Sequence, residues 1–176
     1  MDKAGSPWTV SVAVDDIPDT GLHVDLTAPP EARAAVAALA GLRDLPVLAA
    51  SFDLARRGAG LHVAGEVGAT VGQTCVITLD PIENEVKEPI DVLFMPGAEA
   101  LAPNTGAEQE GVEPPEPLIG GKVDLGALAV EFLLLGIDPY PRKPGVEFAA
   151  PKGDESGDHP FAGLEVLKKR LGGGAA

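Results

Sequence analysis

Residues 46–71 read PVLAASFDLARRGAGLHVAGEVGATV and carry the strongest structural signal in this chain. Apolar residues recur through 46–54 and again through 61–71, which is typical of two β-strands. Between them, residues 56–60 read RRGAG, and the glycines supply the backbone freedom that a hairpin turn requires. This stretch therefore predicts two antiparallel strands joined by a short turn.

Further strands are predicted on both sides of this hairpin. Alternating valines predict a strand over 8–14, and a second short strand is expected over 21–26. Downstream, 75–79 and 86–95 read as two more strands, with Pro81 interrupting the ladder at the turn between them. The first half of the chain thus predicts a meandering antiparallel sheet, with closure into a barrel as one option.

The first predicted helix is the alanine-rich run 31–40. Alanine has the highest helix propensity, and the preceding Pro30 suits a first helical turn. Gly41 follows the run and can adopt the left-handed conformation that ends a helix. We therefore expect a helix near the N-terminus, packed against the sheet.

The second predicted helix covers 125–135. Asp124 stands where its carboxylate can cap the first turn. The apolar residues that share one face of this helix are Leu125, Leu128, Phe132 and Leu135. We expect that face to seal the open side of the sheet.

The domain organisation follows from these elements. Residues 1–148 are predicted to form a single α+β domain. Within it, 97–117 holds five acids and no Lys or Arg, which predicts a disordered acidic loop. Residues 149–176 are predicted to be an extended tail with a short C-terminal helix that starts near Pro160.

Net charge limits the partners of this chain. It has 13 Lys and Arg against 27 Asp and Glu, a formal net charge of -14 and a pI near 4.4. Such a surface repels phosphate backbones at long range and suits basic partners, although it also keeps a protein in solution. Aromatic residues are only 4%, so few platforms exist for stacking bases.

Cysteine usage and apolar runs indicate a cytoplasmic protein. A single cysteine excludes an intramolecular disulfide framework. The N-terminus has no apolar signal region, and no run reaches the roughly 18 apolar residues that cross a bilayer. We expect no membrane partner.

Motifs for metal, phosphate or covalent chemistry are missing from the sequence. His23, His62 and His159 fall in separate predicted elements without a second ligand at zinc spacing, and His62 is expected to face solvent. No nucleophile elbow, phosphate loop or dinucleotide fingerprint occurs. Cys75 has no His or Lys nearby in the sequence to lower its pKa and is read as an inert, packed thiol. We therefore expect no cofactor, no metal and no small-molecule substrate.

Two carboxylates, Asp124 and Glu131, are the most suggestive pair for acid–base chemistry. Asp124 has a full structural explanation as a helix cap, and Glu131 can be a buried acid bonded to backbone or to an arginine. We expect structural roles for both. An enzyme with a carboxylate-lined pocket around them stays as an alternative.

Local basic clusters offset the acidity of the chain. Each has a structural explanation, as a hairpin turn, a loop or the cationic end of a helix. They are also the candidate contacts for a partner or for RNA: Arg56, Arg57, Arg142, Lys143, Lys168, Lys169 and Arg170.

Three stretches together resemble the YceD-type family, the large ribosomal RNA subunit accumulation proteins of bacteria and plastids. Residues 73–82 read QTCVITLDPI, where the family carries Cys-x-x-Cys before a proline; Thr78 holds the place of the second cysteine. Residues 123–141 resemble its Asp-Leu…Glu…Leu-x-Leu-Pro-x-x-Pro core, and 159–169 resemble its closing Asn-Pro-Phe-x-x-Leu-x-x-Leu-Lys. The family-motif positions are Cys75, Pro81, Asp124, Leu125, Glu131, Pro139, Pro141, Pro160 and Phe161.

The resemblance implies a part in making or accumulating large-subunit ribosomal RNA, without a known catalytic activity. Because Thr78 replaces a cysteine and no cysteine follows Pro141, no metal ligands are carried over. Our leading hypothesis is a non-enzymatic factor that binds a basic ribosomal or assembly protein, with pre-ribosomal RNA contacted either directly or through that partner. The rival hypothesis is a direct RNA-binding protein that uses the basic clusters.

Overall fold

The computed structural model describes residues 5–97 and 114–148. By its internal contacts the chain divides into two units, Met1–Val146 and Glu147–Ala176. Every helix and strand in the described ranges lies in the first unit. The predicted C-terminal helix, with Pro160 and Phe161, lies outside the described residues.

The main sheet has five strands in the order β2-β3-β4-β5-β6. Neighbours from β2 to β5 pair antiparallel, whereas β6 pairs parallel with the end of β5. Its strands are β2 (Leu22–Thr27), β3 (Asp44–Arg57), β4 (Gly60–Thr74), β5 (Pro81–Met95) and β6 (Glu116–Pro117). The long β3–β4 and β4–β5 hairpins give this sheet its length.

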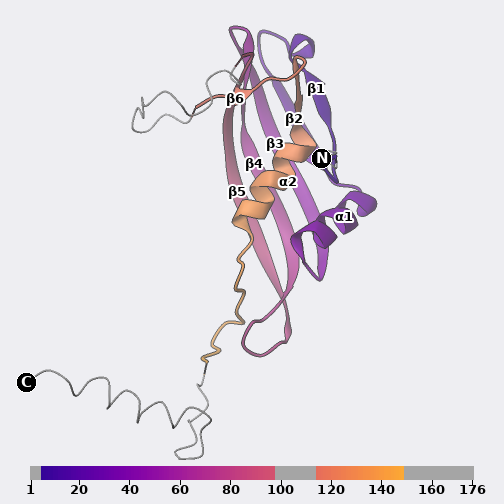
Figure 1. Cartoon of the computed structure of the whole chain (residues 1–176), viewed down its shortest axis with the longest axis vertical. Helices are drawn as coiled ribbons and strands as arrows, with labels where there is room; N and C mark the ends of the chain where they lie inside the picture. The colour runs from indigo at the N-terminus through magenta and orange to yellow at the C-terminus, as the bar shows by residue number, and fades with distance from the viewer. Residues whose placement is uncertain (1–4, 98–113, 149–176) are drawn as a thin grey trace, which may run out of the picture. The chain divides into compact units, whose positions relative to one another are not determined.

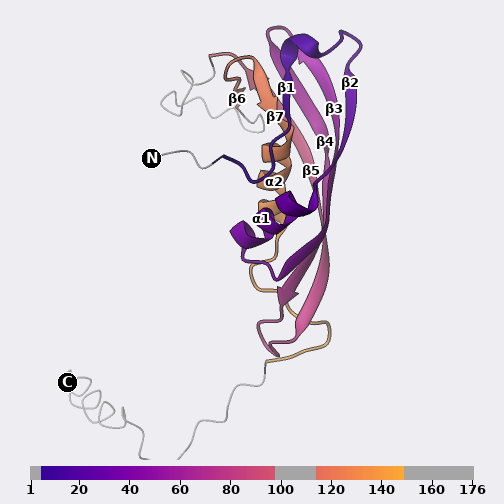
Figure 2. The same cartoon turned by 90° about the vertical axis from the view of Figure 1, so that its right-hand side faces the viewer.

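A second sheet and two helices lie on one side of the main sheet (Figures 1 and 2). These elements are β1 (Ser11–Ala13), which pairs with β7 (Lys122–Asp124), α1 (Pro30–Ala40) and α2 (Leu125–Gly136). A short 3-10 helix, Val14–Asp16, follows β1. The side of the sheet that faces the helices is called the inner face here, and the opposite side the outer face.

Helix α1 begins and ends as the sequence predicts. Pro30 occupies its first turn, and Gly41 adopts a left-handed φ of 66°. That conformation lets the Leu42 N–H bond the Ala37 carbonyl at 2.9 Å. The buried side of the helix rests on β3.

Helix α2 is fixed at its start by the N-terminal segment. The carboxylate of Asp124 accepts hydrogen bonds from the N–H groups of Ala127 at 3.0 Å and Val10 at 2.9 Å. Gly126 allows the close approach, because a Cβ there would lie 2.7 Å from the Trp8 carbonyl oxygen. The predicted cap is therefore confirmed. The same carboxylate also binds the backbone of Val10, the residue just before β1.

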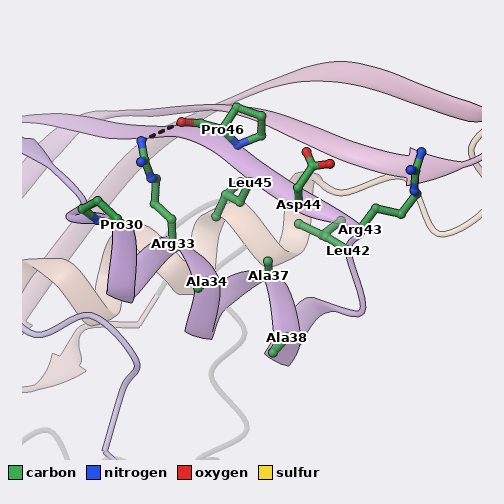
Figure 3. A pocket seen from close by; sticks show the side chains of 10 residues that line it. All are labelled: Pro30, Arg33, Ala34, Ala37, Ala38, Leu42, Arg43, Asp44, Leu45 and Pro46. Atoms are coloured by element: carbon green, nitrogen blue, oxygen red, sulfur yellow. Dashed lines mark hydrogen bonds between the residues drawn. The ribbon is translucent and has the colours of Figure 1, made fainter.

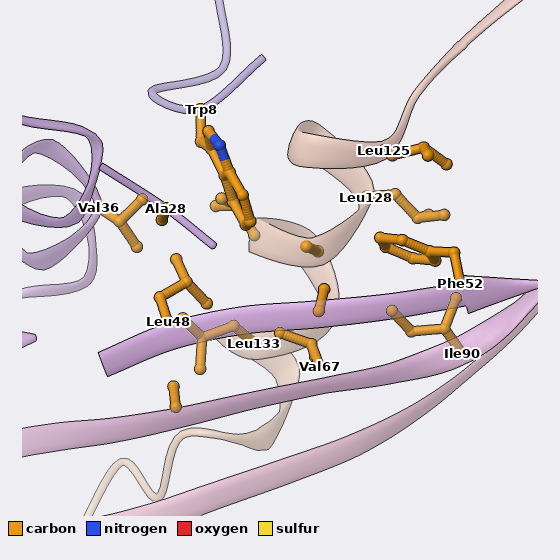
Figure 4. Close-up of a cluster of buried hydrophobic side chains, with 14 of the residues drawn as sticks. Trp8, Ala28, Val36, Leu48, Phe52, Val67, Ile90, Leu125, Leu128 and Leu133 are labelled. Atoms are coloured by element: carbon orange, nitrogen blue, oxygen red, sulfur yellow. The ribbon is translucent and has the colours of Figure 1, made fainter. Parts of the chain in front are cut away.

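The core lies between the inner face and the two helices (Figure 4). Phe52, Leu48 and Val67 from the sheet are fully buried, as are Leu125 and Leu133 from α2 and Val36 from α1. The buried side chain of Trp8 lies between the two helices. Small aliphatic side chains fill most of this core, as the low aromatic content implies.

Two predictions about the sheet are wrong. Both described sheets are open, so the barrel option fails. Residues 75–79 form a turn instead of a strand, because the Cys75 carbonyl accepts the Leu79 N–H at 2.9 Å and Leu79 takes a φ of 62°. Pro81 consequently starts β5, where its missing N–H costs no ladder bond.

Other boundaries differ from the prediction as well. Only Ser11–Ala13 of the segment 8–14 is a strand. Glu116–Pro117, at the end of the predicted acidic loop, forms β6, while 98–113 lie outside the described residues. Leu135 is 76% exposed, because the buried face of α2 is centred on Leu125, Ala129 and Leu133.

Candidate functional site

The far end of the β4–β5 hairpin meets the loop that follows α2. We call residues 75–80 the Cys75 turn and residues 137–146 the post-helix loop. The Val76 N–H donates to the Pro141 carbonyl at 2.9 Å, and the Cys75 N–H donates to the Asp80 carbonyl at 2.9 Å. The structure thereby brings two predicted family-motif segments, around Cys75 and around Pro141, into direct contact.

The thiol of Cys75 lies inside this junction. Its Sγ accepts the N–H of Thr78 at 3.5 Å and the N–H of Lys143 at 3.4 Å. Hydrogen bonding from the Thr78 side chain, followed by these N–H groups, lowers the pKa of the Cys75 thiol to about 6, although burial opposes ionisation. The prediction of a packed thiol is confirmed, and its pKa is lowered by hydrogen bonds although no His or Lys lies near Cys75 in the sequence.

An ion pair joins the same two segments at the surface. The ammonium of Lys143 lies 3.2 Å from Oδ2 of Asp80, and both side chains are about half exposed. Hydrogen bonding from Lys143 lowers the pKa of the Asp80 carboxyl. Lys143 is therefore engaged through both its backbone and its side chain.

A polar network continues from this junction into a shallow groove. The buried Gln73 amide donates to the Asp138 carbonyl at 2.9 Å and accepts from Asn84 at 2.9 Å. The groove has a volume of about 270 Å³ and lies between the end of α1 and the post-helix loop, with Arg43 and Val76 in its lining. Its mixed, open lining suits contact with a polypeptide better than enclosure of a small molecule.

A second groove, of about 450 Å³, runs between α1 and the start of β3 (Figure 3). Alanines of α1 and the side chain of Leu45 line it. Arg33 crosses it to donate to the Pro46 carbonyl at 2.6 Å. Its chemistry is again that of a surface contact.

The suggested carboxylate pair does not form a site. The Asp124 carboxylate caps helix α2, and the Glu131 side chain is exposed. The two residues are separated by about 10 Å along the helix axis, at a rise of roughly 1.5 Å per residue. The expectation that Glu131 is a buried acid is wrong. Leu125, the family-motif position beside the cap, is a core residue.

The basic candidates lie at opposite ends of the sheet. Arg56 and Arg57 stand at the β3–β4 turn, whereas Arg142 and Lys143 stand in the post-helix loop. The 15-residue strand β4 separates these ends, a length of about 45 Å at roughly 3.3 Å per residue. Lys168, Lys169 and Arg170 lie outside the described residues.

The outer face holds a constellation that sequence reasoning missed. His23 Nδ1 lies 2.7 Å from the Asp53 carboxylate, and its Nε2 lies 3.4 Å from Ser51 Oγ and 3.4 Å from Asp25. Diagonally across β4 and β5, His62 Nε2 lies 2.8 Å from the Asp91 carboxylate. His62 faces outward, as predicted.

Ser51, His23 and Asp53 have the connectivity of a hydrolytic triad, but their surroundings do not suit that chemistry. Ser51 lies within the ladder of a central strand, so its N–H is committed to pairing and cannot stabilise an oxyanion. Hydrogen bonding to Asp53 raises the pKa of His23, which extends the pH range in which the imidazole is protonated and cannot act as a base. Both grooves described above are lined by other residues.

The signal for this constellation was present in the strand pattern. His23 and Asp53 both occupy polar positions of their strands, and antiparallel pairing places them directly opposite each other. The register between the two strands, which the sequence left undetermined, was the missing information. The Lys143 contact with Cys75 was missed because the two residues come from segments far apart in the chain.

Within the ranges 5–97 and 114–148, no cluster of three or more His, Cys, Asp or Glu side chains is placed to hold a metal ion. No helix of the described part is both long and apolar enough to cross a membrane.

Fold and surface together define an α+β protein with an open sheet that carries two helices on one face and presents shallow grooves. The chain belongs to the YceD family, described as large ribosomal RNA subunit accumulation protein YceD, because the family model matches residues 63–168. The match includes the Cys75 turn, α2 and the post-helix loop, so the resemblance found in the sequence is confirmed. Searches of curated proteins and of solved structures each found no match.

The family name implies a role in the accumulation of large-subunit ribosomal RNA, and the family is not a known enzyme family.

Proposed function

We propose that this chain supports large-subunit ribosomal RNA accumulation as a non-enzymatic factor that binds a basic ribosomal or ribosome-assembly protein. The observation that carries the proposal is the family match over residues 63–168. Shallow, mixed grooves at the described surface are consistent with binding of a macromolecule.

Charge supports a protein partner in preference to RNA. The formal net charge of -14 attracts the Lys- and Arg-rich proteins that bind ribosomal RNA and repels the RNA itself. Arg56 and Arg57 are too far from Arg142 to form one phosphate-binding patch with it, since β4 lies between them. Contact with pre-ribosomal RNA then occurs through the bound protein.

The proposal is tested by using the full chain as bait in a lysate of cells that express it. An unrelated acidic protein of similar pI is the control bait, because it reports capture by charge alone. Ribosomal or assembly proteins enriched on the chain over the control support the proposal. Recovery of none of them, together with an unchanged ratio of large- to small-subunit ribosomal RNA after the gene is removed, contradicts it.

A nuclease arm separates the protein partner from direct RNA binding. Treating the lysate with ribonuclease before capture leaves a direct protein partner in place. If capture is lost, and if purified chain binds RNA with a steep dependence on salt, the RNA-binding alternative replaces the proposal.

A further inference from the structure

The outer face of the sheet is a broad surface that no described element covers (Figure 2). Strand register gives its composition row by row. Thr27, Ala49, Gly68 and Lys87 form one row; Asp25, Ser51, Glu66 and Pro89 form the next; and His23, Asp53, Ala64 and Asp91 form a third. Strands β2 to β5 thus all contribute to one continuous face.

Small residues alternate with longer polar side chains in the middle of this face. The small, half-buried residues on β3 and β4 are Ala49, Ser51, Ala55, Ala64 and Gly68. Asp53, His62 and Glu66 stand among them. A second polypeptide can therefore approach the backbone at the small residues while its side chains meet these polar groups.

Negative charge dominates the same face. Its exposed carboxylates are Asp25, Asp53, Glu66, Glu83, Glu85 and Asp91, whereas its exposed Lys and Arg side chains are Lys87 and, at the end of β3, Arg57. Within the described ranges, Asp25, Asp53 and Asp91 each lie within 3.4 Å of a histidine nitrogen. The potential over the outer face is thus set mainly by carboxylates held on the sheet.

Charge also decides between possible occupants. RNA and an anionic lipid surface would be repelled by these carboxylates. A second copy placed face to face would bring the same acids against each other, which is unfavourable as well. A cationic polypeptide gains attraction from the acids and can lay extended Arg or Lys stems over the small residues.

We infer that the outer face of the sheet docks an Arg- or Lys-rich polypeptide segment of the partner. The inference rests on the proposed function and deepens it, since it names the surface and the chemistry of the segment that binds there.

The test compares two variants with equal loss of charge. The first, Asp25→Asn with Glu66→Gln and Glu85→Gln, neutralises three outer-face acids and keeps the short His23–Asp53 and His62–Asp91 contacts. The second, Asp15→Asn with Glu31→Gln and Glu131→Gln, neutralises three exposed acids that lie elsewhere in the fold. Circular dichroism and thermal melting establish that both variants fold.

The probe is a short fluorescent peptide of alternating Arg and Ser, followed by anisotropy with the full chain. We expect the outer-face variant to weaken binding by about tenfold or more and the control variant to weaken it by less than about twofold, because only the first removes direct contacts. Equal weakening by both variants would overturn the inference, since it would indicate a general charge effect. Absence of peptide binding to the unmodified chain would overturn it too.

Amide chemical shifts of the unmodified chain give an independent readout that needs no variant. Addition of the peptide should perturb residues of β2 to β5, and perturbations confined to the Cys75 turn or to α1 would contradict the proposed docking surface.

Repeating the lysate capture with both variants separates the two proposals. If the unmodified chain and the outer-face variant recover the same ribosomal proteins, the docking surface is wrong while the proposed function stands. If no bait recovers such proteins but the outer-face variant still weakens peptide binding, the surface stands and the ribosomal partner is wrong.

Discussion

The inner and outer faces of the main sheet are built from the same strands, but they differ in burial and in the residue types that they hold. Along β3, Phe52 is fully buried on the inner face, whereas its neighbours Ser51 and Asp53 stand on the outer face. Burial restricts the inner positions to apolar residues that fit the helices. The outer positions are free of that restriction, so their acids and small residues are available for recognition. The contrast shows that the inner face supplies the buried contacts that stabilise the fold, whereas the outer face can carry residues that bind a partner.

The largest expected contrast between the faces comes from truncating the core. Phe52→Ala should lower the free energy of unfolding by about 3–5 kcal/mol, because it leaves a cavity under α2. Glu66→Ala, on the outer face, should change it by no more than about 0.5 kcal/mol. Urea unfolding of both variants measures the difference. Similar losses in the two variants would mean that the outer face also carries folding energy.

Two glycines on opposite faces of β4 sharpen the comparison. A Cβ at Gly65 would collide with the Ser51 carbonyl, whereas nothing lies within 4 Å of a Cβ at Gly68. Gly65→Ala should therefore destabilise the protein by about 1–3 kcal/mol. Gly68→Ala should be neutral or stabilising by up to about 1 kcal/mol, because it only restricts the unfolded chain. Thermal melts of the two variants should move apart, and a shared direction would contradict the difference in space between the faces.

The layer on the inner face depends on its helix cap. Asp124→Ala removes the acceptor of the Ala127 and Val10 N–H groups and should cost about 1–2 kcal/mol. Asp124→Asn keeps an acceptor oxygen and should retain most of that stability. Urea unfolding gives both values. If Asn and Ala cost the same, the carboxylate charge is the important property and the hydrogen bonds are secondary.

The smallest effect is expected on the outer face, from the titration of His23. Asp53 and Asp25 raise its folded-state pKa above 6.5, so protonated His23 is stabilised by folding. This contribution is fully present below pH 6.5 and is lost as the pH rises through the raised pKa. Imidazole chemical shifts should show the raised pKa, and Asp53→Asn should move it back toward 6.5. An unchanged midpoint in that variant would assign the shift to other groups, such as Asp25.

The hairpin around residues 56–60 and both helices were predictable because local rules determine them. Pro30, Gly41 and Asp124 each act on neighbours in the sequence, and the structure has them in the expected roles. The Cys75 turn was misread because its apolar residues resemble a strand, while the turn is set by hydrogen bonds to Asp80 and to the post-helix loop. The exposed position of Leu135 was missed because the helical pattern allowed two adjacent faces and only packing against the sheet selects one.

The family positions near Cys75 were predictable as motifs, but not as a contact. The spacing of Cys75 and Lys143 in the sequence does not show how close they lie in space. In the fold, the Lys143 backbone nitrogen lies 3.4 Å from the Cys75 Sγ. The pairing of His23 with Asp53 likewise required the register of β2 on β3. Long-range pairing is therefore the information that local patterns lacked in this chain.

The enclosed thiol offers a way to watch local opening of the native protein. Because Cys75 is fully buried between the Cys75 turn and the post-helix loop, an alkylating reagent can reach the sulfur only when this junction opens. The labelling rate of this single cysteine would then measure how often the junction opens while the rest of the molecule stays folded. A bound partner that holds the loop in place would slow the reaction, so one natural residue serves as a built-in sensor of engagement.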